Sequence, residues 1–439
     1  MAKRHQYSSG QRIGRRDVYV RSDLRPIYGQ KNQRKFPFKP VLAIALVLIA
    51  VAGCAYALIS GEIADNAKKP AATSAAGASG SASTSISTSS TAMATTLAAA
   101  VAKAKPAGAG ASSQPAATQP QARPTVSIAA VGDLCFMDSN HNSLGSAASL
   151  LASMKPQLSA ADVTLGNLEI ALTSGGAAQD KTYTFRAPLS SAAGIAQSGF
   201  DVVSVANNHA LDYGRDQFPA ELDALHQAGL TVIGGGLNKQ QAWAAQTVNR
   251  NGARIGILAF SEITPADYAA TDTEPGVAYT QDTAAMTAAV AAAKASKKYD
   301  YIIVFMHWGV EGDYQNDARQ TAEAHAFIDA GADAIIGSHP HRIQGVEYYK
   351  GGLIAYSLGN FVFGTAAKVS CQTMLLNFKL TDKGPEAVTA TPVYIVRGSP
   401  QLATGSDWNQ IATIIKSSAA HNGTTVTFAN NLATFVKPQ

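Results

Sequence analysis

The feature that most constrains the fold of this 439-residue chain is a series of apolar, strand-like runs that each end in polar side chains. Short buried strands separated by helical segments are typical of an α/β fold with a parallel sheet. The carboxyl ends of parallel strands lie along one edge of the sheet, where such folds usually bind ligands. The runs end at Asp133, Asn167 to Glu169, Asn208-His209, His307 and His339-Pro340-His341. The pattern therefore predicts one polar site assembled from distant parts of the chain.

The most informative run is DVVSVANNHALDYG, residues 201–214. Its β-branched residues predict a short strand, and Asn207, Asn208 and His209 follow with turn chemistry. An Asn carbonyl oxygen is a neutral metal ligand, and an imidazole binds metal or transfers a proton. Asp212, three residues after His209, is placed to orient that imidazole. The alternative, a capped turn with a hydrogen-bonded His, fits this stretch alone equally well.

The residues at the strand ends have the composition of a divalent-metal site. Carboxylates neutralise the charge of the ion, imidazoles add softer bonds, and an amide oxygen completes the shell. Four of the nine His residues fall in these motifs, which favours a site over chance. We expect one or two divalent ions, with Mn, Fe, Zn and Mg not distinguished by sequence. The expected metal ligands are Asp133, Asn167, Glu169, Asn208, His307, His339 and His341.

The positive net charge of the chain is concentrated at its N-terminus. Residues 1–39 carry eleven Lys or Arg and two Asp, a net of +9, whereas the remaining 400 residues carry a net of −4. The sequence pI of 8.9 therefore does not indicate nucleic-acid binding by the globular part, and no nucleic-acid partner is expected.

An apolar run without charges, Val41 to Ile59, follows this basic leader. Its 19 residues are long enough to cross a hydrocarbon core of about 30 Å as a helix. We expect a basic cytoplasmic tail at 1–39, a transmembrane signal anchor at 40–60, and the rest of the chain outside the cell membrane. A cleaved signal peptide usually has a shorter basic segment. The sequence VAGC also resembles a lipobox, which would make the protein a lipoprotein anchored at Cys54.

Residues 61–124 consist almost entirely of Ala, Ser, Thr, Gly, Pro and Gln. Such a segment has too little apolar area to offset its ordering entropy, so we expect a disordered linker with an end-to-end distance of roughly 45 Å. Strand-like patterning begins at Thr125. We therefore place the globular domain at 125–399 and a small C-terminal appendage at 400–439, where the pattern weakens.

Two cysteines, Cys135 and Cys371, are the candidates for an extracytoplasmic disulfide in the globular part. Sequence does not show whether they meet, and two buried thiols are an equally good interpretation.

Taken together, these motifs resemble the CapA family, the bacterial capsule synthesis proteins linked to poly-γ-glutamate. That family is similar to the calcineurin-like metallophosphatases, which implies a four-layer α/β/β/α sandwich with a metal site at the strand ends. The matching segments are VGDLCF (131–136), GNLE (166–169), VSVANNHALDYG (203–214), MHWGVE (306–311), GADAIIGSHPH (331–341) and LIAYSLGNFVFG (353–364).

The resemblance also implies roles for individual residues. It gives His209 the role of proton donor to a leaving group, supported by Asp212, and gives Arg186 and Asn207 contacts with an anionic substrate. A surface salt bridge is the alternative for Arg186. Among the metal ligands, Asp133 matches the first Asp, Asn167 or Glu169 the bridging carboxylate, Asn208 the Asn ligand, His307 the lone His, and His339 and His341 the closing pair.

The sequence departs from the metallophosphatase pattern in two places. Cys135 stands where phosphatases of this class usually have a His, and the bridging position holds Glu instead of Asp. These departures leave the number of metal ions open.

Two functions are consistent with these features. The first is a membrane-anchored extracytoplasmic hydrolase, phosphoesterase-like or amidase-like, acting on a phosphoester or on an anionic polymer such as poly-γ-glutamate. The second is a non-catalytic accessory subunit that binds the polymer and other capsule synthesis subunits in the membrane.

Overall fold

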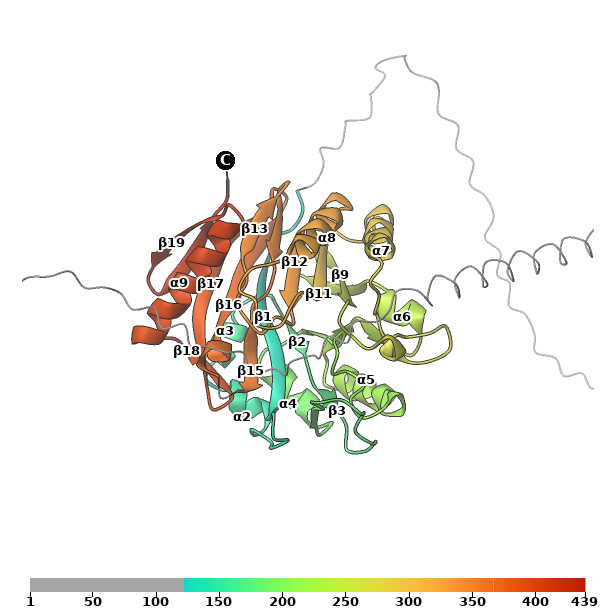
Figure 1. Ribbon diagram of the computed structural model, residues 1–439. Helices are drawn as coiled ribbons and strands as arrows, with labels where there is room; N and C mark the ends of the chain where they lie inside the picture. The colour runs from blue at the N-terminus through green and yellow to red at the C-terminus, as the bar shows by residue number, and fades with distance from the viewer. Residues whose placement is uncertain (1–121, 366, 439) are drawn as a thin grey trace, which may run out of the picture. The chain divides into compact units, whose positions relative to one another are not determined.

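The computed structural model describes residues 122–365 and 367–438 (Figure 1). The tail at 1–39, the anchor at 40–60 and all but the last three residues of the linker lie outside the described residues. Within the described ranges, no helix is both long and apolar enough to cross a membrane.

Two β-sheets form the centre of the fold (Figure 1). The larger has the order β19-β20-β17-β16-β1-β2-β5-β6, with β15 pairing with β1 and β18 with β17. The smaller has the order β13-β14-β12-β11-β9-β8. Strands β1, β2, β5 and β6 are parallel to one another, as are β9, β11, β12 and β14. Each sheet therefore has an edge where several strand ends meet.

The strands of the larger sheet are β1 (Val126–Asp138), β2 (Val163–Leu168), β5 (Val202–Ser204), β6 (Thr231–Ile233), β15 (Asn360–Gly364), β16 (Gln372–Thr381), β17 (Gly384–Val396), β18 (Ser399–Leu402), β19 (Thr425–Ala429) and β20 (Leu432–Val436). Those of the smaller sheet are β8 (Gln246–Arg250), β9 (Ala253–Ser261), β11 (Tyr301–His307), β12 (Ala334–Ser338), β13 (Val346–Tyr349) and β14 (Gly352–Ala355). Two short pairs add β3 (Ala171–Leu172) with β4 (Arg186–Ala187), and β7 (Gly235–Gly236) with β10 (Gly276–Val277).

The helices other than α9 cover the outer faces of the two sheets, whereas α9 packs against the core between the sheets. They are α2 (Ala147–Leu151), α3 (Lys155–Leu158), α4 (Ser191–Gln197), α5 (Phe218–Gln227), α6 (Lys239–Trp243), α7 (Thr283–Ala295), α8 (Ala318–Asp329) and α9 (Gly405–His421). Residues of α2, α3, α4 and α5 share a core with the larger sheet, and residues of α6, α7 and α8 share one with the smaller sheet.

Alternation along the strands explains these layers, because successive side chains point to opposite faces. In β1, Ile128 and Ala130 pack against the smaller sheet, whereas Ala129 and Val131 pack toward the helices. The strands of the smaller sheet alternate in the same way. The α/β class expected from the sequence is confirmed, and the described residues are layered as helices, sheet, sheet and helices.

Strand β1 changes partners at Gly132, and this change brings Asp133 to the strand ends. Before this point β1 pairs with β16 and β2, and at Asp133 it also pairs with β15. The Asp133 N–H donates to the Gly359 carbonyl at 3.1 Å. A Cβ at Gly132 would lie 1.7 Å from that carbonyl oxygen, so the close approach requires glycine.

The segment 400–439, which the sequence analysis sets apart as an appendage, contributes α9, β19 and β20 to this domain. Strand β20 pairs with β17, and Ile411, Ile415 and Phe435 belong to the core between the sheets. Cys135 and Cys371 are both buried free thiols, so the two cysteines are not paired.

These contacts predict that the C-terminal segment is needed for stability. We expect a 122–439 fragment to unfold cooperatively in urea, and a 122–399 fragment to unfold at much lower urea or to aggregate. Each buried Ile or Phe contributes about 1.5–3 kcal/mol, so losing three approaches the total stability of a typical domain. Circular dichroism during urea titration is the measurement. Equal midpoints for the two fragments would contradict the assignment.

Candidate functional site

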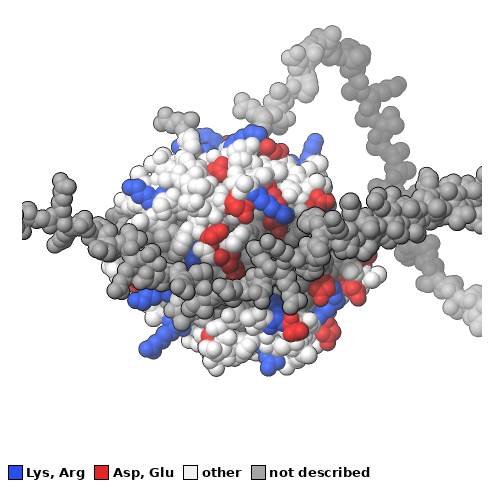
Figure 2. Space-filling model, viewed as in Figure 1, with Lys and Arg blue, Asp and Glu red and all other residues white. Residues whose placement is uncertain are grey.

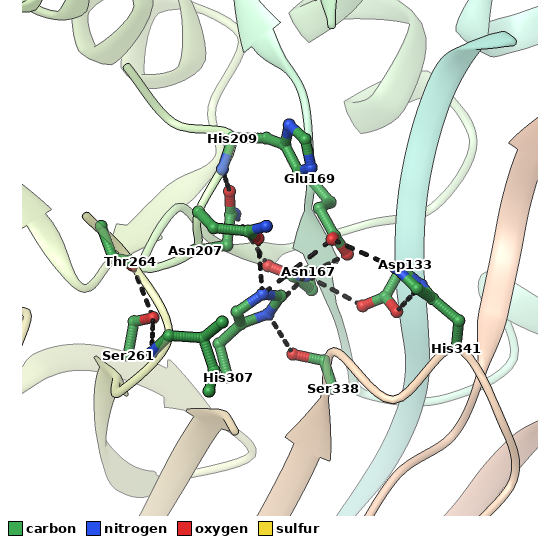
Figure 3. A network of polar contacts seen from close by, with 12 residues as sticks. Asp133, Asn167, Glu169, Asn207, His209, Ser261, Thr264, His307, Ser338 and His341 are labelled. Carbon is green, nitrogen blue, oxygen red and sulfur yellow. Dashed lines mark hydrogen bonds and ion pairs between the residues drawn. The ribbon is translucent and has the colours of Figure 1, made fainter. Parts of the chain in front are cut away.

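The seven predicted metal ligands lie together in one largely buried cluster at the strand ends of both sheets (Figure 3). Asp133 comes from β1, Asn167 and Glu169 from the end of β2, and Asn208 from the turn after β5. The smaller sheet supplies His307 at the end of β11, and His339 and His341 in the turn after β12. The larger sheet thus contributes carboxylates and amides, and the smaller sheet contributes imidazoles.

The carboxylate part of the cluster consists of Asp133, Glu169 and the ring of His341. The Nδ1 of His341 lies 3.2 Å from Asp133 Oδ2, and its Nε2 lies 3.8 Å from Glu169 Oε1. Asn360 Oδ1 lies 2.8 Å from the same Nδ1 and fixes the ring. The sequence analysis did not include Asn360, because nothing in the Gly-Asn-Phe turn distinguishes it from an ordinary turn residue.

The imidazole part of the cluster is built around His307. Its Nδ1 lies 3.0 Å from Ser338 Oγ, which donates to the Met306 carbonyl at 3.1 Å. If Nδ1 carries the proton, Nε2 directs its lone pair toward Asn208 Oδ1, only 2.9 Å away. Two acceptor atoms this close together can both bind one cation. Ser338 accepts the Nδ1 proton on the other side of the ring and so fixes the tautomer.

The turn that carries the last two His residues has an unusual backbone. His339 has a φ of +96° and His341 a φ of +54°, in the left-handed region that favours glycine. Non-glycine residues held there persist only when the surrounding structure fixes them, and they cluster at functional sites. The turn directs the His339 ring to within 4.7 Å of the His307 ring, measured between centroids.

Three buried polar atoms in the cluster have no hydrogen-bond partner among the described residues: Asp133 Oδ2, Glu169 Oε1 and His339 Nδ1. The contact of Asp133 Oδ2 with His341 is within ion-pair distance but lacks hydrogen-bond geometry. Native proteins rarely leave such groups unpaired, because each costs about 1–3 kcal/mol. Cations bound within this cluster would provide partners for such atoms.

Two groups of ligand atoms fit such a cation. One is Glu169, His307 and His339, and the other is Asp133, Glu169 and His341, with Glu169 common to both. In each group the ligand atoms lie within 4.8 Å of one another. The residues therefore fit one or two divalent ions, with Glu169 between them.

The electrostatics of the site agree with this fit. Burial, followed by the charges of His339 and His341, lowers the pKa of His307 well below its usual range. Burial lowers the pKa of His339 to about 3, so both rings are neutral, the form that binds metal. Burial opposes protonation of His341, but its contact with Asp133 outweighs this and raises its pKa.

Asn167 lies at the centre of the cluster, where it donates to both carboxylates. Its Nδ2 is 2.9 Å from Asp133 Oδ1 and 3.1 Å from Glu169 Oε2. Its Oδ1 accepts from Asn207 Nδ2 at 3.0 Å, which fixes the orientation of the amide. Since Asn167 presents N–H groups to the carboxylates, its role as a metal ligand stays a prediction.

Asn207, expected to contact substrate, is fully buried and bonded to protein. Its Nδ2 also donates to the Leu168 carbonyl at 2.8 Å, and its Oδ1 accepts from the His209 N–H at 2.9 Å. These bonds link the turn after β5 to the end of β2. The observed contacts of Asn207 are thus structural, and substrate contact remains a prediction.

His209 and Asp212 form a hydrogen-bonded pair next to the cluster. The Nδ1 of His209 lies 2.7 Å from Asp212 Oδ2, which also accepts from the Phe185 N–H at 2.7 Å. The Phe185 ring packs on the imidazole with centroids 4.6 Å apart. Asp212 therefore holds the proton on Nδ1 and leaves Nε2 available.

Lys181 is the principal residue that the sequence analysis missed. Its Nζ lies 2.6 Å from Asp212 Oδ1 and 2.5 Å from the Asn208 carbonyl oxygen. The ammonium thus offsets the charge of the buried Asp212 and fixes the backbone of Asn208. The only signal in the sequence was its position five residues before Arg186, in the same loop.

Arg186 and Cys135 contribute no ligand to the cluster. Arg186 is exposed in β4, and its guanidinium carbon lies 4.8 Å above the centre of the Tyr213 ring. Cys135 is buried among apolar side chains of the helix-side core. Burial raises the pKa of its thiol well above the usual range, so the position holds a neutral group.

The two buried carboxylates predict a pH dependence of stability in the metal-free protein. Burial, and then the charge of Asp133, raises the pKa of Glu169 well above its ordinary value of 4.5. The folded protein therefore holds this proton more tightly than the unfolded chain does. The resulting stabilisation is complete below the ordinary pKa and is lost as pH rises through the raised pKa.

We expect the melting temperature of EDTA-treated full-length protein to fall more steeply than that of Glu169→Gln as pH rises above the ordinary Glu pKa of 4.5. The Gln variant keeps the shape of the side chain but does not titrate, and it shares every other titrating group. Calorimetry is the measurement, and adding a divalent ion should flatten the wild-type profile. Parallel profiles for the two proteins would rule out a raised pKa at Glu169.

Known proteins are similar to about half of this chain. The chain is 34% identical over 235 residues to the capsule biosynthesis protein CapA of Bacillus anthracis, covering 53% of this chain and 57% of that protein. It is 32% identical over 255 residues to the PGA biosynthesis protein CapA of Bacillus subtilis, covering 57% of this chain and 66% of that protein. The chain thus matches less than two thirds of the length of either relative.

Solved structures are similar at a lower level. NAD nucleotidase from Haemophilus influenzae is 14% identical with a TM-score of 0.39, covering 67% of this chain and 62% of that chain. A hypothetical protein from Thermus thermophilus is 17% identical with a TM-score of 0.39, covering 61% and 98%. TM-scores below 0.5 carry no argument about this protein.

A protein-family model also matches this chain. The model of the bacterial capsule synthesis protein family PGA_cap matches residues 127–365, more than half of the chain. This span includes all seven residues of the cluster together with Lys181, His209 and Asp212. The chain therefore belongs to the bacterial capsule synthesis protein family PGA_cap.

Proposed function

We propose that this protein is a membrane-anchored extracytoplasmic hydrolase that acts in capsule polymer synthesis. The observation that supports the catalytic part is that three buried atoms of the strand-end cluster lack hydrogen-bond partners among the described residues, and that their residues belong to two ligand groups sharing Glu169. The names of the relatives, which refer to capsule and PGA biosynthesis, support the process. The substrate is a phosphoester or an amide bond in an anionic polymer such as poly-γ-glutamate.

The residues that would hold the metal are Asp133, Glu169, Asn208, His307, His339 and His341. A bound divalent ion, or a pair of ions, supplies an activated water and polarises the scissile group. Asn167 keeps the two carboxylates apart by donating to each of them. Ser338 and Asn360 orient His307 and His341 from behind, as outer-shell partners do in metal sites.

The acid–base role belongs to His209. Burial lowers the pKa of His209, although the adjacent Asp212 acts in the opposite direction. An anionic substrate near the ring would favour the protonated form, because opposite charges stabilise each other at short range. With Nδ1–H held by Asp212, the second proton resides on Nε2, from which it passes to the leaving group. Lys181 positions Asp212 and the adjacent turn.

The alternative is a non-catalytic accessory subunit that binds polymer and partner membrane proteins. One observation favours it: the cluster has the neutral amide of Asn167 between its carboxylates, and a neutral Cys135 thiol where the resemblance leads us to expect His. A relative in Mycobacterium tuberculosis, 33% identical over 212 residues, is named "Probable polyglutamine synthesis accessory protein". In this role the ligand residues would bind polymer without turnover.

The proposed location predicts an intact N-terminus. We expect mass spectrometry of the membrane fraction to find the full-length chain with residues 1–60 attached, because the 39-residue basic leader exceeds that of ordinary cleaved signals. A diacylated N-terminus at Cys54 would establish the lipoprotein alternative instead. Recovery of the full-length protein without membranes would contradict both.

Substitutions separate metal binding from acid catalysis. We expect Asn208→Ala and His339→Ala to lower both bound metal and hydrolysis, because each removes a ligand atom. His209→Ala should retain its metal and lose roughly 10²–10⁴-fold in turnover. The loss should shrink for substrates with good leaving groups, which need no proton. Metal content by mass spectrometry and hydrolysis of aryl phosphates and γ-glutamyl anilides are the measurements.

His325→Ala is the matched control, since this imidazole pairs with Glu347 at 2.8 Å and stacks on Tyr349 outside the site. It should change stability without changing metal content. If His209→Ala melts early but hydrolyses every substrate as well as wild type, His209 is structural. If wild-type protein binds metal but hydrolyses neither substrate class, the accessory role takes precedence.

A further inference from the structure

A cavity of about 780 Å³ lies beside β4, lined by residues outside the metal cluster. Its volume falls within the usual range for ligand sites, roughly 300–1,000 Å³. The buried side chains of Phe136 and Met137 contribute apolar surface to its lining. Hydroxyl groups surround it, from Ser143, Ser146, Thr173, Ser174, Ser190 and Ser191.

Among the described residues that line this cavity, Arg186 is the only charged one. Its guanidinium stacks on the Tyr213 ring, which orients the group without neutralising it. Among the described residues, no carboxylate lies within ion-pair distance of Arg186. The salt bridge that the sequence analysis left as an alternative is therefore not present in the described structure. The cavity thus has an uncompensated, oriented positive charge.

The hydroxyl groups provide further hydrogen-bonding capacity. In the described part of the chain, the side chains of Ser174, Ser190 and Ser191 form no hydrogen bond with protein. Ser191 is only 8% exposed. A ligand with oxyanions would accept hydrogen bonds from these hydroxyls and from the Arg186 fork, and its methylene groups would contact the apolar lining.

The domain as a whole is negatively charged, so the positive charge of Arg186 is important for binding an anion. Residues 122–438 contain 20 Lys or Arg and 26 Asp or Glu, a net of −6. On the face shown in Figure 2, Lys and Arg are scattered and form no extended basic surface. A polyanion is repelled by such a domain on average, so binding requires a local positive charge inside a defined pocket.

The cavity and the metal cluster are connected through two short segments of chain. Phe185 and Arg186 are consecutive, and in extended chain their side chains point to opposite sides. Phe185 packs on His209, whereas Arg186 lines the cavity. Likewise, Asp212 holds His209 while the next residue, Tyr213, supports Arg186. The cavity and the proposed acid–base pair are therefore distinct sites that share these two supporting segments.

We propose that this cavity is a binding subsite for a carboxylate-bearing segment of an anionic polymer, held by Arg186 separately from the metal ligands. The identity of the ligand as a glutamate polymer rests on the proposed function. The existence of an oxyanion subsite does not, because it follows from the cavity and its single cation. A polyphosphate chain presents related oxyanions, so the experiment includes it as a second probe.

The test measures binding of a fluorescent γ-linked glutamate oligomer to EDTA-treated full-length protein by anisotropy. Removing metal separates this subsite from the metal cluster. Arg186→Ala should weaken binding by about 10- to 100-fold, the usual effect of losing a charge-assisted bidentate contact. Ser190→Glu, which adds a negative charge to the cavity wall, should weaken it similarly. Both variants should retain wild-type metal content.

Arg254→Ala is the matched control. This exposed arginine pairs with Asp300 at the start of β9, at the opposite end of that strand from the metal cluster. It should bind the oligomer as wild type does. Unchanged binding in both Arg186→Ala and Ser190→Glu, or equal weakening in Arg254→Ala, would overturn the subsite. Equal or tighter binding of polyphosphate would overturn the assignment to a carboxylate polymer. Absence of hydrolysis would overturn only the proposed catalysis.

Discussion

The short distance between two buried carboxylates is the physical constraint on which this site depends. Asp133 and Glu169 are both fully buried, and Asn167 donates one N–H to each of them. Two such carboxylates repel each other and lose hydration, so an ion pair, a proton or a cation is needed to stabilise them. The nearby imidazoles are mostly neutral by virtue of burial. A divalent cation is the partner that fits both kinds of group.

The fold creates this constraint by bringing two parallel strand edges together. Strand β1 brings Asp133 to the strand ends, where it pairs with Asn167 of β2 and Asn360 of β15, and Gly132 allows the Gly359 carbonyl to approach there. Strand β12 leads into a turn whose left-handed residues aim His339 and His341 at the carboxylates. A stable domain does not otherwise need the strained turn or the close glycine contact. Both features serve to position the residues of the site.

Sequence alone predicted the α/β class and the residues that meet at the strand ends, because apolar runs followed by Asp, Asn and His mark where strands end in polar side chains. The role of these residues as metal ligands remains a prediction. It did not predict Lys181 or Asn360, since each acts through contacts with residues far away in sequence. The packing of α9 on the sheets was also missed, because an Ala- and Ser-rich helix has a weak apolar pattern. The orientation of a side chain, such as the amide of Asn167, depends on a hydrogen-bond network that no sequence pattern specifies.

The central claim is that the strand-end cluster holds a divalent metal. The most direct measurement is anomalous diffraction from crystals of the protein grown without chelators, combined with metal analysis of the same sample. We expect one or two anomalous peaks between Glu169 and the rings of His307, His339 and His341, with a matching stoichiometry in solution.

 The peaks should lie within bonding distance of Glu169, the carboxylate common to both ligand groups. Crystals that diffract well but show no peak in the cluster after soaking in Mn²⁺ or Zn²⁺, from protein that retains no metal in solution, would contradict the account.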